Sequence, residues 1–190
     1  MKLEGLKVLD LSQFLPGPHF TMMMGDHGAD VIRIEAPIGE PTRTIGARQG
    51  NASVWFRNTH RGKKSVVLDL KQAEGVAAFM RLAESADVVV EAFRPGTVDR
   101  LGIGYKAVRA VNPRIVYVSI AAFGQTGPMA KRPAHDLSIQ AESGVVGLNC
   151  APGGEPARPA RPRAAGLRGW RRRNDQRLDS FSRCRHDRQH

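Results

Sequence analysis

Short apolar runs alternate with amphipathic segments through the first 156 residues, and this alternation restricts the fold more than any other feature. Five runs have the length and composition of β-strands, namely residues 6–11, 30–34, 65–69, 87–91 and 114–120. Three segments between them have the pattern of helices, namely residues 16–27, 72–85 and 105–111. Strands that alternate with helices predict an α/β protein, with a Rossmann-like parallel sheet and flanking helices.

The composition changes near residue 157. From Ala157 to Arg173, 15 of 17 residues are Arg, Ala, Pro or Gly. GC-rich DNA that is read out of frame encodes these four residue types, so the segment 157–190 could be a frameshift product that replaces the rest of a longer enzyme. The alternative is a genuine disordered basic tail. We therefore expect residues 1–156 to form an incomplete sheet domain and residues 157–190 to be disordered.

Most of the positive charge lies in this tail. From Pro156 onward there are 11 Arg and three Asp, while the whole chain has a net charge of +11. The charge therefore says little about the domain, although a non-enzymatic module whose tail binds RNA or DNA phosphates stays open as a less favoured alternative. Two single cysteines, no signal peptide and no apolar stretch of about 20 residues predict a cytoplasmic protein with no membrane span and no metal site.

Four loops follow predicted strands and have the composition of a ligand site. They are residues 12–18, the segment at Lys71, residues 92–96 and residues 121–128. In parallel sheets the ligand lies outside the carboxyl ends of the strands. The Gly, Pro, Lys, Arg and aromatic residues of these loops suit a large phosphorylated ligand, although ordinary turn chemistry explains each loop alone. Neither G-x-G-x-x-G nor G-x-x-x-x-G-K-[ST] occurs, so NAD and P-loop nucleotides are disfavoured.

Taken together, these segments resemble the family III CoA-transferases of the CaiB/BaiF type, which include formyl-CoA transferase and α-methylacyl-CoA racemase. The resemblance is carried by Asn58 and by residues 6–12, 16–18, 28–35, 62–71, 87–96, 99–102, 112–119, 123–128 and 135–136. It covers the domain and none of the tail, so it corresponds to the N-terminal part of the family only. Intact members form homodimers, and the resemblance leaves open whether this chain does so.

The resemblance implies that the substrates are a CoA thioester and a carboxylic acid. Coenzyme A therefore takes part as a substrate, and no prosthetic group is implied. The residues that it assigns to CoA are Gln13, Pro16, Leu68, Lys71, Phe93, Arg94 and Arg100. Those from Leu68 to Arg94 correspond to the adenine-nucleotide end of CoA. The loop that begins at Gln13 corresponds to the thioester end. Many relatives have a basic residue where this chain has Ala36, and Arg33 or Arg43 is a candidate to compensate.

The resemblance also implies two catalytic groups. Transferases of the family use an Asp nucleophile, and racemases use an Asp together with a His that corresponds to His135. The Asp should fall near Ala165, where there is no carboxylate, and the next acids are Asp175 and Asp179. We therefore expect a CoA-transferase that is truncated and inactive as it stands. A racemase-type enzyme, favoured by His135, is the alternative.

Overall fold

The computed structural model describes residues 1–148, which fall into two units. The first unit is Met1–Ala134, and the second begins at His135. The described part of the second unit contains α6 (Asp136–Glu142) and α7 (Val145–Leu148). The expected domain boundary at residue 156, the tail and the position near Ala165 lie outside the described residues, as do Asp175 and Asp179.

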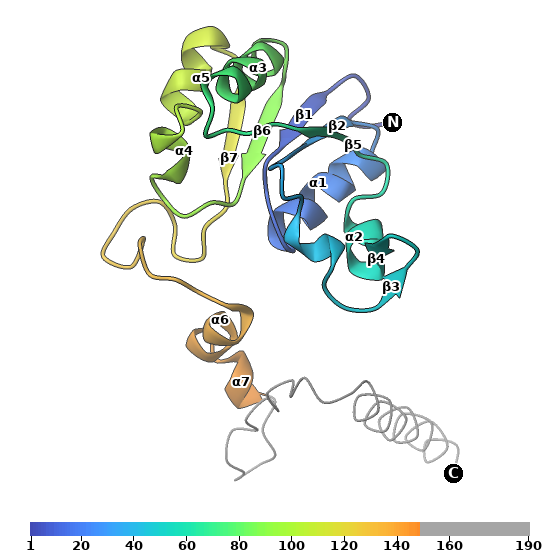
Figure 1. Ribbon diagram of the computed structural model, residues 1–190. Helices are drawn as coiled ribbons and strands as arrows, with labels where there is room; N and C mark the ends of the chain where they lie inside the picture. The colour runs from blue at the N-terminus through green and yellow to red at the C-terminus, as the bar shows by residue number, and fades with distance from the viewer. Residues whose placement is uncertain (149–190) are drawn as a thin grey trace. The chain divides into compact units, whose positions relative to one another are not determined.

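The first unit is built on a five-stranded parallel sheet in the order β5-β2-β1-β6-β7 (Figure 1). The strands are β1 (Lys7–Asp10), β2 (Asp30–Glu35), β5 (Lys64–Val67), β6 (Val88–Glu91) and β7 (Val116–Ser119). The chain builds outward from β1 to β5 on one side and then returns to build β6 and β7 on the other. This strand order is the Rossmann order, and it confirms the predicted α/β class.

The three central strands carry the apolar core on both faces of the sheet. Leu9 pairs in register with Ile32 of β2 and Val89 of β6. Leu9 and Val89 belong to the core cluster on one face, and Val8 and Val90 to the cluster on the other, all four with no exposed surface. Side chains alternate between faces along a strand, so a run that is apolar throughout must be covered on both sides.

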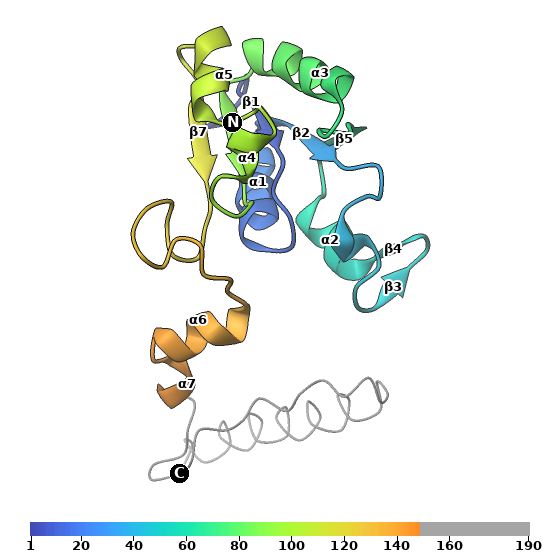
Figure 2. The same cartoon turned by 60° about the vertical axis from the view of Figure 1, so that its left-hand side comes forward.

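Helices cover both faces, as the sequence predicts. α1 (Pro16–Asp26) lies against the Val8 side, whereas α3 (Ala73–Glu84) and α5 (Tyr105–Val111) lie side by side over the Leu9 side (Figure 2). α3 packs an apolar side against the sheet, where Phe79 and Ala83 are fully buried. α1 ends just before Gly28, whose φ of 102° favours glycine. Among the described residues, no helix is long and apolar enough to cross a membrane.

Several short elements of the first unit were not predicted from the sequence. They are η1 (Pro41–Arg43), β3 (Arg48–Gln49), β4 (Ala52–Ser53), α2 (Val54–Thr59) and α4 (Thr97–Arg100). The first four make an excursion between β2 and β5, with β3 and β4 as an antiparallel pair. They are too short to show a hydrophobic period, and side-chain hydrogen bonds cap the starts of η1 and α2. α2, for example, starts where the Ser53 hydroxyl accepts a hydrogen bond from the Phe56 N–H at 2.9 Å.

Candidate functional site

Three loops at the carboxyl edge of the sheet begin in the same way. In each, a carboxylate accepts a hydrogen bond from the backbone N–H two residues later. The bonds join Asp10 to Ser12 at 2.9 Å, Asp69 to Lys71 at 3.0 Å and Glu91 to Phe93 at 2.7 Å. Side-chain bonds of this kind fix the turn that follows a strand. Three of the four predicted ligand loops therefore leave the sheet in defined directions.

Lys71 and Arg100 come together on one surface pocket. The pocket has a volume of about 570 Å³, within the usual range of about 300–1,000 Å³ for ligand pockets. Its lining consists of Leu70, Lys71, Gln72, Ala73, Val76, Ala77, Arg100 and Leu101. Both cationic side chains are exposed, and the pocket lies at the N-terminus of α3, whose Gln72 makes no side-chain cap. Two cations, free backbone N–H groups and an apolar wall suit a phosphorylated ligand with an organic body.

The other predicted CoA residues do not line this pocket. Gln13 is half-buried in the loop after β1, and Pro16 is exposed at the first position of α1. Leu68 and Phe93 are half-buried and pack against the core, while Arg94 is exposed after β6. The pocket thus brings together two of the seven residues assigned to CoA.

A buried cluster of charges lies beneath the loop after β1. The Lys63 Nζ atom is 3.0 Å from Asp10 Oδ2, and the Arg33 Nη1 atom is 3.5 Å from Asp10 Oδ1. All three side chains are at most 2% exposed. Burial alone would raise the pKa of Asp10, but Lys63 and Arg33 hold it below its usual value. Burial lowers the pKa of Lys63, against the attraction of the Asp10 carboxylate. Asp10 is therefore ionised in the folded protein.

The family model for CoA-transferase family III matches residues 3–165 of this chain. The chain belongs to CoA-transferase family III. It is 45% identical over 156 residues to an acetyl-CoA:oxalate CoA-transferase from Acetobacter aceti, and 40% identical over 159 residues to the succinyl-CoA:glutarate CoA-transferase of Homo sapiens. These matches cover 82% and 83% of this chain, but only 40% and 36% of the relatives. The chain thus spans about two fifths of the length of the curated relatives that it matches.

Solved structures agree with this assignment. A CaiB/BaiF family protein from Brucella suis superposes with a TM-score of 0.78 at 40% sequence identity, covering 81% of this chain and 42% of that one. The Rv3272 protein from Mycobacterium tuberculosis gives a TM-score of 0.74 at 41% identity, covering 80% of this chain and 43% of that one. The resemblance drawn from the sequence is therefore confirmed at the level of both family and fold.

In this family III chain, both arginines that are candidates to compensate for Ala36 have partners within the protein. Arg33 is 2% exposed, and its Nη1 donates to the Ser12 carbonyl. Arg43 donates two hydrogen bonds of 2.8 and 2.6 Å to the Glu35 carboxylate. Its Cζ atom also lies 3.9 Å from the centre of the Phe56 ring. Burial opposes the ionisation of Glu35, but these bonds and that from Ser65 lower its pKa to about 2. Both guanidiniums therefore make their contacts within the protein, Arg33 in the interior and Arg43 at a partly exposed position.

The buried acids that shape the site were not predicted from the sequence. Asp10, Glu40 and Glu91 are 0%, 3% and 1% exposed. Asp10 and Glu91 each end a strand directly after apolar residues, and this position is a signal that the sequence itself contains. Burial raises the pKa of Glu91, whose carboxylate bonds with Ser119 and the Phe93 N–H offset this only in part.

His135 is the first residue of the second unit. It is exposed and occupies the position just before α6, where its side chain makes no capping hydrogen bond. The carboxylate partner expected in racemases would lie outside the described residues. The structure thus gives His135 an accessible position and no particular chemical role.

Proposed function

We propose that this chain provides the CoA-binding part of an enzyme that moves CoA between an acyl-CoA thioester and a carboxylic acid. The observation that carries the proposal is the pocket shared by Lys71 and Arg100 at the N-terminus of α3. The proposal is also supported by relatives that are named as CoA-transferases acting on oxalate, glutarate and malate. Their acids differ and CoA is common to all of them, so the acid of this protein stays open.

The pocket is suited to the adenine-nucleotide end of CoA. That end carries a 3′-phosphate and a diphosphate, which need cations and N–H donors. Lys71 and Arg100 supply the cations, and the first turn of α3 supplies N–H groups and the positive end of its dipole. Val76, Ala77 and Leu101 provide apolar surface for the remainder of the ligand. Glu74 in the first turn of α3 carries the opposite charge and would have to face away from the phosphates.

Binding can be separated from turnover in this chain. Transfer by the family's covalent route needs a carboxylate that attacks the thioester carbonyl and releases the CoA thiolate. The sequence has no carboxylate near Ala165, where the resemblance expects it. We expect CoA to bind without transfer. Incubation with acyl-CoA, an acceptor acid and hydroxylamine should then leave every Asp and Glu unmodified, whereas an adduct on Asp136, Asp175 or Asp179 would show that another carboxylate has taken the role.

Calorimetric titration with adenosine 3′,5′-bisphosphate and with CoA tests the binding step. Lys71→Ala and Arg100→Ala should each weaken the affinity for both ligands about tenfold, because each removes a charge-assisted bond to phosphate. Lys64→Ala is the matched control, because it removes an exposed lysine that pairs with Asp30 away from the pocket. Wild-type protein that binds neither ligand, or the same affinity in all three variants, would refute the proposal.

A further inference from the structure

The loop after β1 contains a backbone conformation that a side chain rarely adopts. Phe14 has a φ of 63°, which makes it the one residue other than glycine with a positive φ among the described residues. For a bulky residue this conformation is strained and persists only where the surroundings enforce it. The Phe14 ring is 47% exposed, so its own packing provides little of that enforcement. Something else must hold the loop.

Buried charged side chains hold this loop along its length. Glu40 Oε1 accepts a hydrogen bond from the Phe14 N–H at 2.9 Å. Arg33 donates to the carbonyl of Ser12, and Lys63 donates to the carbonyl of Pro18 at 2.9 Å. These anchors come from β2, from the segment after it and from the residue just before β5. The loop conformation is thus set by three parts of the chain that are distant in sequence.

Gln13 lies between the anchored residues and is not itself anchored. Its side chain is half-buried and makes no hydrogen bond to any part of residues 1–148. The bonds on either side fix its backbone through Ser12 and Phe14. An amide has two donors and an acceptor, so a fixed and unpaired amide at the carboxyl edge of the sheet is ready to bind a polar ligand group.

We propose that Phe14, Glu40 and Arg33 are positioning residues that hold the Gln13 amide in place for the pantetheine arm of CoA. This inference rests on the proposed function, since it takes CoA as the ligand. The strain at Phe14 is compensated by buried bonds in the free protein, so the loop does not have to be ordered when the ligand arrives. Preorganisation of this kind raises affinity because less conformational entropy is lost on binding.

Two substitutions at Phe14 test the inference without disturbing the core. Phe14→Pro forbids a positive φ and removes the N–H that Glu40 accepts. Phe14→Gly keeps the N–H and permits the positive φ. Both lack the phenyl ring, so any contact that the ring makes cancels in the comparison. The probes are CoA, which has the pantetheine arm, and adenosine 3′,5′-bisphosphate, which lacks it, with circular dichroism and thermal unfolding to check the fold.

We expect Phe14→Pro to bind CoA about tenfold more weakly than Phe14→Gly, with equal affinities of the two variants for adenosine 3′,5′-bisphosphate. Equal CoA affinities for the two variants would overturn the inference, and so would a parallel loss of both ligands in Phe14→Pro. Wild-type protein that binds the two probes equally well would show that the arm is not engaged, which overturns the inference and leaves the proposed function standing. Wild-type protein that binds neither would overturn both.

Discussion

Lys63 and Asp10 form an ion pair of 3.0 Å in which the two side chains are 1% and 0% exposed. The same Lys63 ammonium donates to the Thr21 hydroxyl at 2.7 Å, and Asp10 also accepts from the Thr21 hydroxyl at 2.7 Å. Removing two charges from water is costly, and the cost is recovered only when every polar atom is bonded. These bonds join Asp10 at the end of β1, Thr21 in α1 and Lys63 just before β5 in one network.

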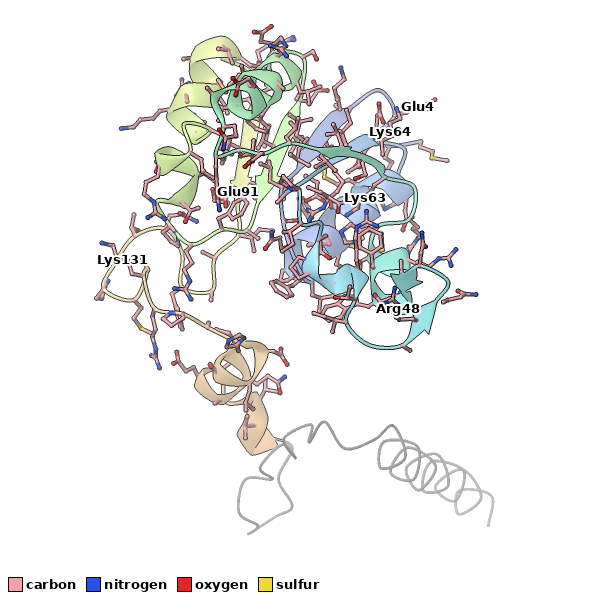
Figure 3. The ribbon with its side chains drawn as sticks, in the orientation of Figure 1. Glu4, Arg48, Lys63, Lys64, Glu91 and Lys131 are labelled. Atoms are coloured by element: carbon pink, nitrogen blue, oxygen red, sulfur yellow. The ribbon has the colours of Figure 1, made fainter. Side chains whose placement is uncertain are left out.

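The first prediction concerns the two adjacent lysines labelled in Figure 3. Lys63→Met should lower the free energy of unfolding by about 3–5 kcal/mol, because it leaves the buried Asp10 without its closest cation. Lys64→Met is the control, since its pair with Asp30 is exposed and contributes no more than about 1 kcal/mol. Urea unfolding at neutral pH measures both. Equal losses in the two variants would contradict the assignment of the network.

The second prediction concerns His60 and mild acid. His60 is 8% exposed and stacks on Phe56, and burial, together with Lys63 and Arg33, lowers its pKa to about 4 from 6.5. Between these values the unfolded chain binds a proton that the folded protein does not, so stability falls as the pH decreases. The loss by pH 4 should be on the order of 3 kcal/mol.

Urea unfolding at neutral pH and at about pH 5 checks this prediction. His60→Phe should flatten the dependence on pH in this window, even if it changes the stability at neutral pH. His19→Gln, which replaces an exposed histidine, serves as the control. A dependence as steep in His60→Phe as in the wild type would assign the effect to other groups.

The third prediction concerns Arg43 and stronger acid. The pKa of Glu35 is about 2 in the folded protein against 4.5 ordinarily, so its stabilising effect is complete above pH 4.5 and is lost as the pH falls towards 2. Arg43→Met should lower the free energy of unfolding by about 2 kcal/mol at neutral pH, because it removes the charged partner of a buried carboxylate.

The Arg43→Met deficit should shrink as the pH falls below 4.5, since Glu35 then becomes protonated more readily in the variant. Arg57→Met is the matched control, because Arg57 is exposed and donates to the Gln49 carbonyl instead. Unfolding followed by tryptophan fluorescence at several pH values distinguishes the two. A deficit that stays constant down to about pH 3 would show that Arg43 acts through packing on Phe56 and not through Glu35.

The fourth prediction compares two helical glycines. A Cβ at Gly75 in α3 would overlap the carbonyl oxygen of Asp69, whereas a Cβ at Gly25 in α1 would lie 3.7 Å from the Val31 side chain. Gly75→Ala should destabilise the protein by about 1–3 kcal/mol and displace Lys71, so it should also weaken the binding of adenosine 3′,5′-bisphosphate. Gly25→Ala should be neutral or stabilise by up to about 1 kcal/mol, because alanine favours the helix. Thermal unfolding and calorimetric titration give both quantities, and a stabilising Gly75→Ala would contradict the close approach.

The sequence by itself determined the elements that depend on local pattern. α5 has the predicted bounds, and α3 lies within one residue of its predicted ends, because a helix with an apolar stripe is specified by residues three and four apart. The five strands of the sheet were also located, because their β-branched apolar runs are short and bounded by turns. The family resemblance rested on the same segments and their order.

The tertiary structure alone decided which charged side chains are buried and which are exposed at the pocket. Arg33 and Arg100 are the same residue type, yet one is 2% exposed under the loop after β1 and the other is exposed at the pocket. The difference arises because Arg33 lies on a central strand between Asp10 and the Ser12 carbonyl, whereas Arg100 ends the four-residue helix α4. Burial of a charge depends on partners brought by β1, β2 and β5 from distant parts of the chain, and no local pattern records those partners.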